Sequence, residues 1–150
     1  MSVVARGLKF PEGQILLGDG SVAFTQQAGT VCRFDGGAVE VIANVGGGPN
    51  SCCLGGDGSI YICQNGGVVG SWRSSDPRSP GIQRITADGR VSSTATQIGS
   101  RRLIAPNDLA FGADGALYFT DPAQPFDPKD PIDLGGIYRL GSEGGTLVAE

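Results

Sequence analysis

Histidine is absent from this 150-residue sequence, and methionine and tryptophan occur once each. Without an imidazole, the chain's own residues cannot form a Ser-His-Asp or Cys-His nucleophile system. A general base would have to be a carboxylate, a lysine, a tyrosine or a metal-bound hydroxide. The missing histidine therefore excludes the commonest routes to covalent hydrolysis within this chain.

Long helical and long hydrophobic patterns are also missing. No window of helical length sustains apolar residues at i, i+3 and i+4, so we expect almost no helix. No apolar run approaches the roughly 20 residues of a bilayer span, and the first residues lack a charged leader followed by a long apolar core. We therefore expect a cytoplasmic protein that has no membrane partner.

Positive charge is sparse. The 11 Lys and Arg are outnumbered by 15 Asp and Glu, which gives a net charge of -4, and the cations are dispersed apart from the pair Arg101-Arg102. A nucleic-acid backbone needs a stripe of basic side chains. We therefore expect no nucleic-acid partner.

The four cysteines, Cys32, Cys52, Cys53 and Cys63, form no Cys-x-x-Cys pair. Structural zinc is disfavoured by this spacing and by the lack of histidine. We expect reduced thiols that pack as small apolar side chains. A disulfide between Cys63 and either Cys52 or Cys53 remains an alternative.

What the sequence has in abundance is turn residues and an internal repeat. The 26 glycines and 9 prolines are spread along the whole chain, which favours many short strands. Three segments align without a gap, namely residues 11–25, 49–63 and 106–120. Each has Pro, then Glu or Asn, an apolar run, an Asp-Gly turn and a second apolar run, which is typical of a β-hairpin with a polar oxygen group at its entrance.

A second repeated element follows each hairpin, with a short strand that contains Arg33, Arg84 or Arg139 and then a turn with glycine. Two hairpins make four antiparallel strands, which is the blade of a β-propeller. We therefore expect an all-β fold in which residues 1–150 form a partial β-propeller, about three blades of a six-bladed ring. The blades are expected to start near residues 11, 49 and 106. Insert loops are expected at residues 66–80 and 121–135.

Stacking of the repeats around an axis would bring Glu12, Asn50 and Asn107 to equivalent places. Gathered oxygen side chains are what a hard cation such as Ca²⁺ needs. Three blades cannot close a ring, however. We therefore expect a fragment of a larger protein, a homodimer that completes the propeller, or a product that has lost its remainder.

The string APNDLAFGADGALYFTDP, from Ala105 to Pro122, resembles the third-blade signature of the gluconolactonase, senescence marker protein and luciferin-regenerating enzyme family. The segment from Phe10 to Gly13 is similar to its first-blade Glu-Gly signature. The resemblance implies a six-bladed propeller that binds a divalent cation, usually calcium, and hydrolyses lactones. It also implies metal-binding roles for Glu12 and Asn107, with a further Asn and the catalytic Asp beyond residue 150.

Four other residues are candidates for substrate binding or for supporting the metal ligands. Asn50 shares the repeat position and either lines the central tunnel of the propeller, which we expect, or contacts the metal. Asp108 either orients Asn107 or accepts backbone hydrogens in a turn. Arg101 either meets an anionic substrate or is solvated, and Asp121 is either a base or a turn former before proline. No residue of this chain is assigned as the catalytic base.

The leading functional hypothesis is cation-dependent hydrolysis of a small aliphatic or sugar-type lactone, by this chain or by a larger enzyme of which it is a part. The alternatives are a non-catalytic propeller that binds partners through its loops, and a small-molecule enzyme resembling strictosidine synthase.

Overall fold

Short antiparallel strands make up the chain in the computed structural model, which describes residues 2–122 and 135–150. The described residues contain no α-helix and form three four-stranded sheets and two short hairpins. The first sheet contains β1 (Pro11–Leu16), β2 (Val22–Gln26), β3 (Thr30–Phe34) and β4 (Val39–Asn44). The second contains β5 (Pro49–Leu54), β6 (Ile60–Gln64), β9 (Gly81–Ile85) and β10 (Val91–Ala95). The third contains β13 (Leu109–Phe111), β14 (Leu117–Asp121), β15 (Gly136–Gly141) and β16 (Gly144–Ala149). The predicted all-β class with four-stranded antiparallel blades is confirmed.

The two hairpins lie in the connections. The pair β7 (Val68–Val69) and β8 (Trp72–Arg73) forms within the predicted insert 66–80. The pair β11 (Gln97–Ile98) and β12 (Arg101–Arg102) joins the second sheet to the third. Most of the other predicted insert, 121–135, lies outside the described residues.

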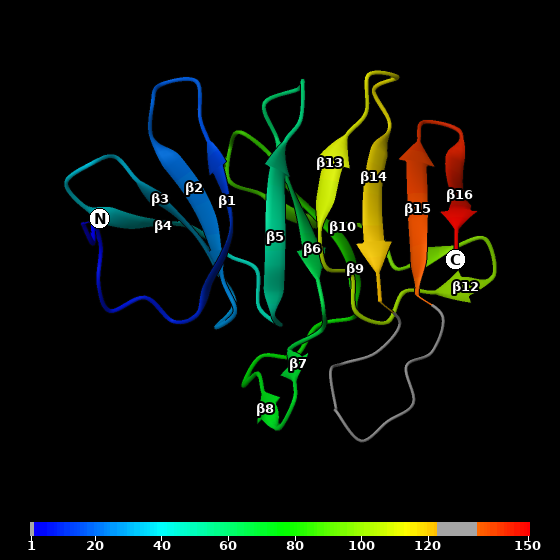
Figure 1. The fold of residues 1–150 in the computed structure, drawn as a ribbon, viewed down its shortest axis with the longest axis horizontal. Coiled ribbons are helices and arrows are strands. Elements are labelled where there is room, and N and C mark those ends of the chain that lie inside the picture. Colours follow the sequence, from blue (N-terminus) through cyan, green and yellow to red (C-terminus); the bar gives the residue numbers. More distant parts are fainter. Residues whose placement is uncertain (1, 123–134) are drawn as a thin grey trace.

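The three sheets lie side by side in chain order (Figure 1). Their first strands, β1, β5 and β13, run in the same direction and begin at the lower end of the view, from which the β7–β8 hairpin projects (Figure 1). β5 contacts β1 as well as β13. The starts of the three strands are therefore neighbours, and the Asp-Gly turns lie at the opposite end.

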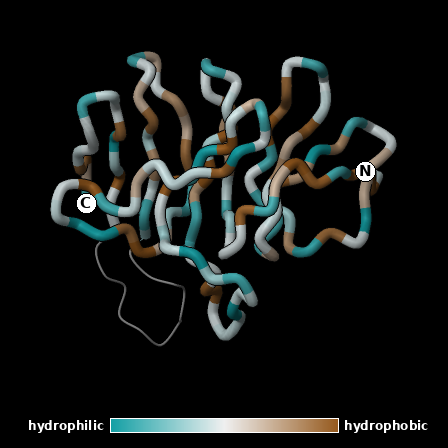
Figure 2. Tube along the Cα trace, turned by 180° about the vertical axis from the view of Figure 1, so that it is seen from behind, coloured by the Kyte–Doolittle hydropathy of each residue, from teal (hydrophilic) through white to brown (hydrophobic). Residues whose placement is uncertain are grey.

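Two hydrophobic clusters fill the spaces between adjacent sheets. One joins the first and second sheets and contains Ala23, Val31, Ala43, Val45, Cys52, Ile60, Ile62 and Ile85. The other joins the second and third sheets and contains Cys63, Ile82, Ile98, Leu103, Leu109, Leu117, Phe119 and Tyr138. Hydrophobic residues recur along the strands, with hydrophilic residues at many of the turns (Figure 2). Burial between neighbouring sheets is thus what orders the repeats.

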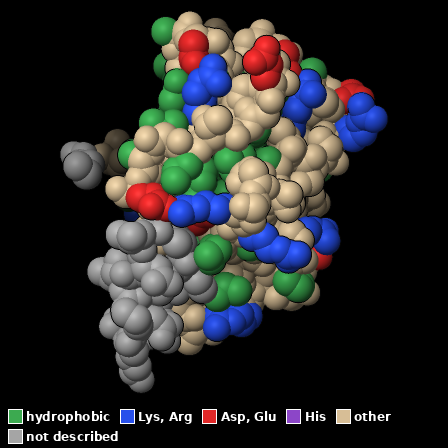
Figure 3. Space-filling view, turned by 90° about the vertical axis from the view of Figure 1, so that its right-hand side faces the viewer, with side chains coloured by type: hydrophobic (Ala, Val, Ile, Leu, Met, Phe, Trp, Pro, Cys, Tyr) green, Lys and Arg blue, Asp and Glu red, His purple; other side chains and the backbone are tan. Residues whose placement is uncertain are grey.

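The third sheet leaves hydrophobic side chains exposed. Figure 3 shows them gathered among charged groups on the side of the molecule where β12, β15 and β16 lie. The exposed members on this sheet include Ile137, Leu147 and Val148, which are 45%, 38% and 53% accessible. Leu147 pairs with Tyr138, the neighbour of Ile137, so Ile137 and Leu147 lie on opposite faces of this sheet.

An ion pair ties the Asp-Gly turn of each sheet to its third strand. The pairs are Asp19–Arg33 at 2.6 Å, Asp57–Arg84 at 2.6 Å and Asp114–Arg139 at 2.8 Å. Each aspartate also accepts the backbone N–H two residues further on. These aspartates therefore stabilise the blade turns and take no part in the site described below.

The ion pairs predict a dependence of stability on pH. Hydrogen bonds from Ser59 and the charge of Arg84 hold the pKa of the Asp57 carboxyl below its usual value of 3.8. A carboxyl whose pKa is lower in the folded state stabilises the fold above pH ~3.8, and this contribution disappears as the pH falls through the lowered folded value. Asp57→Asn should therefore lower the melting temperature at pH 7, and the gap to the wild type should close below pH ~3.8. Thermal unfolding between pH 7 and pH 2 measures this gap, and a constant gap would contradict the assignment.

Candidate functional site

A polar cavity of about 470 Å³ opens where β1, β5 and β13 begin. Its lining comes from all three sheets and comprises Glu12, Gly13, Gln14, Asn50, Ser51, Asn107 and Asp108. The structure thus brings together Glu12, Asn50 and Asn107, which occupy equivalent positions in the repeat. Oxygen-bearing side chains dominate this lining, and neither histidine nor cysteine contributes to it.

An irregular ladder positions Glu12. Glu12 lies opposite Thr25, and the next paired residue on β1 is Ile15, so the register shifts between them. Such a bulge redirects side chains at a strand end. The fully buried Thr25 hydroxyl lies 3.1 Å from the carbonyl oxygen of Glu12 and 3.0 Å from that of Asn50, and its single hydrogen is shared between these two acceptors. One hydroxyl therefore ties the first and second sheets together at the cavity.

Glycine is required directly after Glu12. Gly13 has a φ of 51°, in the left-handed region that glycine tolerates. A Cβ at this position would lie 2.8 Å from Cβ of Ser51 and 2.9 Å from the backbone nitrogen of Cys52. The thiol of Cys52 instead donates to the Gly13 carbonyl at 3.0 Å. The close approach of β1 to β5 is the physical reason for the Glu-Gly pair.

A buried amide chain holds Asn50. Its Oδ1 accepts a hydrogen bond from Gln27 Nε2 at 2.6 Å, and Gln27 Oε1 accepts one from Asn65 Nδ2 at 3.2 Å. Asn65 Oδ1 in turn accepts the backbone N–H of Gly67 at 2.9 Å. Gln27 and Asn65 are 6% and 8% accessible. The hydrogen-bond chain through Gln27 and Asn65 thus fixes the orientation of the Asn50 amide.

Sequence reasoning missed Gln27 and Asn65, although the repeat carried a signal for them. Extending the aligned segments by two residues places Gln26-Gln27, Gln64-Asn65 and Asp121-Pro122 in register. The first member of each pair accepts a backbone N–H from the entry to its sheet's first strand. The acceptor and donor residues are Gln26 with Lys9, Gln64 with Gly48, and Asp121 with Ile104 and Ala105.

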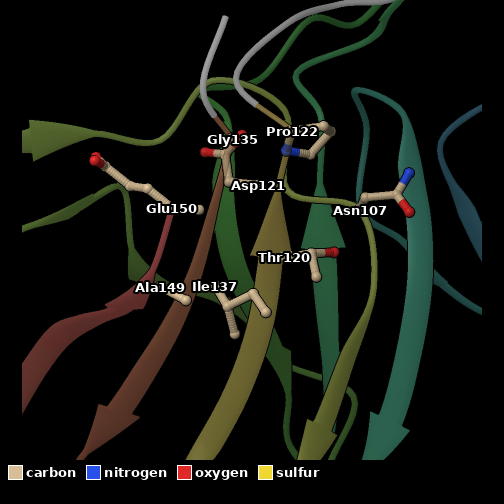
Figure 4. A pocket seen from close by; sticks show the side chains of 9 residues that line it. Asn107, Thr120, Asp121, Pro122, Gly135, Ile137, Ala149 and Glu150 are labelled. Atoms are coloured by element: carbon tan, nitrogen blue, oxygen red, sulfur yellow. The ribbon is translucent and has the colours of Figure 1, made fainter.

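Asp121 therefore holds the chain that leads into the third sheet. It is 3% accessible, and its two oxygens accept the N–H groups of Ile104 at 2.8 Å and Ala105 at 2.9 Å. It lines a different pocket, of about 320 Å³, in which the Asn107 amide points away from it (Figure 4). Asp121 is absent from the lining of the polar cavity, and its hydrogen bonds hold the segment that leads to Asn107.

Asn107 is held by its backbone and presents its side chain to the cavity. Its N–H donates to the Thr120 carbonyl at 2.9 Å, and its own carbonyl accepts from the Ser51 hydroxyl at 2.7 Å. Asp108 also lines the cavity and is exposed, with Oδ1 accepting the N–H of Leu109 at 2.9 Å. Asn107 and Asp108 thus join Glu12 and Asn50 at one place.

Arg101 is not brought to this cavity. It lies on β12, its side chain is 50% accessible, and it forms an ion pair with Glu150 beyond the end of β16. The β11–β12 hairpin packs near β16 and not near the starts of β1 and β5. Of the two alternatives for Arg101, this placement favours a solvated side chain over contact with a substrate in the cavity.

The cysteines are buried or partly buried thiols, and none of the four is in a disulfide. Cys63 lies opposite Ser51 in the ladder, whereas Cys52 lies opposite Ile62. Burial raises the pKa of the Cys52 thiol to about 12, and burial with the nearby Asp108 carboxylate raises that of Cys53 to about 12. These thiols are protonated at neutral pH and serve as packing groups.

The chemistry of the cavity lining fits a hard cation. Carboxylate and amide oxygens are preferred by calcium and magnesium. Within residues 2–122 and 135–150, no three His, Cys, Asp or Glu side chains gather closely enough to hold a metal. Binding would therefore depend on the mixed set of carboxylates and amides from three sheets.

Comparison with known proteins identifies relatives of this chain. Residues 10–149 match the family model described as SMP-30/Gluconolactonase/LRE-like region. A gluconolactonase from Zymomonas mobilis is 28% identical over 103 residues, which cover 65% of this chain and 26% of that protein.

In the described residues, no helix is long and apolar enough to cross a membrane.

Solved structures share the fold. A gluconolactonase from Xanthomonas campestris superposes with a TM-score of 0.70 at 24% identity, over 95% of this chain and 47% of that one. A putative gluconolactonase gives a TM-score of 0.71 at 23% identity, over 97% of this chain and 50% of that one. This chain thus spans about half the length of these structures. Matched over nearly its whole length by the family model, the chain belongs to the SMP-30/gluconolactonase/LRE-like family.

Proposed function

We propose that this chain supports the hydrolysis of a lactone with the help of a bound divalent cation, calcium in the first place. The observation that carries the proposal is the convergence of Glu12, Asn50 and Asn107 from three consecutive sheets on one cavity. Membership of a family that contains gluconolactonases supports the same reaction class.

Glu12 and Asn107 are the residues that would hold the cation. Each contributes an oxygen, and each has its backbone carbonyl held by a hydroxyl, that of Glu12 by Thr25 of the same sheet and that of Asn107 by Ser51 of the second sheet. Calcium takes six to eight oxygen ligands, so water and additional protein groups would complete the set. When bound, the cation supplies a positive charge that polarises the lactone carbonyl and stabilises the developing oxyanion.

The other lining residues have roles in orientation and proton transfer. Because Gln27 donates a hydrogen bond to Asn50 Oδ1, the Asn50 amide has its N–H groups available for a substrate oxygen. Asp108 has one oxygen held by Leu109 N–H, and its second oxygen can accept a proton from water. The open polar cavity admits that water together with the substrate.

Calcium titration followed by thermal unfolding tests the cation site. A ligand at 100 times its Kd stabilises the folded state by about 2.7 kcal/mol, so the melting temperature should rise by several degrees. Asn107→Ala should weaken the calcium response about tenfold, because one fixed oxygen ligand is lost. Asn44→Ala, an exposed asparagine on β4, is the matched control and should respond like the wild type.

Acid release from δ-gluconolactone, with EDTA and then with excess calcium, tests the reaction itself. Activity that EDTA abolishes and calcium restores supports the proposal, whereas calcium binding without hydrolysis contradicts it.

Mass in solution should be measured on the same samples. We propose that a second copy, packed on the exposed face of the third sheet, supplies additional ligands, and a monomer with full activity would contradict this assembly.

A further inference from the structure

A second cavity, of about 550 Å³, lies beside the polar one and has a different character. Its lining residues are Lys9, Phe10, Gln27, Ala28, Val69 and Trp72. Two aromatic rings and two aliphatic side chains supply most of this lining, with Lys9 as its one charged member. A volume of this size is typical of sites for small organic ligands.

The β7–β8 hairpin supplies one wall. Val69 and Trp72 lie directly opposite each other in the hairpin, so their side chains emerge on the same face. Trp72 is 39% accessible, which is unusual for the largest apolar side chain of a small domain. The hairpin thus presents an apolar pair toward the cavity without burying it in the core.

The hairpin is anchored at its base. Ser74 N–H donates to the Gly67 carbonyl at 2.8 Å, and Gly47 N–H donates to the Asp76 carbonyl at 2.7 Å. Asn65 Oδ1 accepts the Gly67 N–H at 2.9 Å. These bonds join the hairpin to the segments that enter β5 and leave β6, so the wall is preformed.

Phe10 supplies the facing wall in an unfavourable backbone conformation. Its φ is 58°, and it is the single non-glycine residue with positive φ in the part of the chain that the structure describes. The Phe10 carbonyl accepts the Gln27 N–H at 3.1 Å, yet its side chain is 62% accessible. A bulky residue in the left-handed region is strained, and such outliers concentrate at ligand sites.

Gln27 connects the two cavities. Its side chain lines the apolar pocket and donates to Asn50 Oδ1, and Asn50 lines the polar cavity. The Gln27–Asn50 pair is therefore the partition between an oxygen-rich site and an apolar one. A ligand whose polar head lies over Asn50 and whose apolar tail passes over Gln27 would contact both linings.

We propose that the pocket of Phe10, Val69 and Trp72 binds the alkyl or aryl substituent of a lactone, so that this chain prefers lactones with an apolar side group to polyhydroxylated sugar lactones. This inference rests on the proposed function for the identity of the polar head. It adds a substrate class that the polar cavity alone does not specify.

Trp72 is the only tryptophan of the chain, so its fluorescence reports directly on this pocket. The ligands are 5-alkyl-pyrrolidin-2-ones, which are lactams that match γ-lactones in shape and are not hydrolysed under assay conditions. Affinity should rise about fourfold with each added methylene until the pocket is filled, with a blue shift of the Trp72 emission. An affinity that does not depend on the chain length of the substituent would overturn the proposal.

Variants separate this pocket from nonspecific apolar binding. Phe10→Gly should weaken the binding of a hexyl lactam about tenfold or more without lowering the melting temperature, since glycine relieves the positive φ. Leu16→Ala, an exposed apolar residue on β1 that is 73% accessible, is the control and should leave binding unchanged. Equal effects of the two variants would overturn the assignment.

Hydrolysis assays keep this inference distinct from the proposed function. A higher kcat/KM for γ-octalactone than for δ-gluconolactone, reversed by Phe10→Gly, supports the inference. If δ-gluconolactone is hydrolysed but lactam affinity does not change with the chain length of the substituent, the inference is overturned and the proposed function is retained. Lactam binding that grows with chain length, without hydrolysis of any lactone, supports the apolar pocket and contradicts the proposed function.

Discussion

Glu12→Gln is expected to abolish both the calcium-induced stabilisation and the hydrolysis of lactones. The substitution preserves the shape of the side chain and removes one of the two carboxylates that line the polar cavity. Loss of a residue that hydrogen-bonds to a metal ligand typically reduces metal affinity or activity about 10- to 100-fold. Loss of a charged ligand should therefore exceed 100-fold in calcium affinity, as measured by titration calorimetry, and in kcat/KM.

Glu40→Gln is the matched control for this experiment. Glu40 lies on the outer strand β4 and is exposed, so the same change of charge there should leave calcium affinity and activity unaltered. Glu12→Asp keeps the charge but shortens the side chain by one methylene, and an intermediate loss is expected. Wild-type calcium affinity in Glu12→Gln would remove Glu12 from the proposed cation site.

Gln64→Leu is expected to cause the largest loss of stability. Gln64 is fully buried, and its Oε1 accepts the N–H groups of Gly48 at 2.6 Å and Gly66 at 3.0 Å. Its Nε2 donates to the carbonyl of Gly46 at 3.0 Å and to Oε1 of Gln83 at 3.2 Å. Leucine would leave these buried groups without partners, at about 1–3 kcal/mol each before relaxation.

The expected decrease in the free energy of unfolding is about 3 kcal/mol or more, equivalent to roughly 10 °C in melting temperature. Urea denaturation measures it. Gln97→Leu, at an exposed position of β11, is the control and should change stability by less than about 0.5 kcal/mol. Because Gly48 leads directly into Pro49 and Asn50, Gln64→Leu should also weaken the calcium response. Unchanged stability would show that the amide network is dispensable.

Several features of this protein follow from the sequence itself. The period of Asp-Gly turns and alternating apolar runs determines hairpins, because short strands with tight turns leave few other ways to pair the backbone. The aspartate of each Asp-Gly turn recurs at a fixed place in the repeat, but its arginine partner follows 14, 27 or 25 residues later, so the ion pairs depend on the pairing of the strands. The equivalence of Glu12, Asn50 and Asn107 could likewise be predicted, because stacked repeats place equivalent residues side by side.

Other features were decided only by the tertiary structure, because they depend on contacts between segments far apart in the chain. By sequence, Asp121 is either a base or a turn former before proline, and only the structure shows that its buried carboxylate accepts the N–H groups of Ile104 and Ala105. Arg101 was separated from the cavity because the β11–β12 hairpin packs beside the third sheet. The Gln27–Asn50 hydrogen bond arises because the first and second sheets pack side by side, and the apolar pocket arises because the β7–β8 hairpin lies near Lys9, Phe10 and Ala28, placements that no local periodicity encodes.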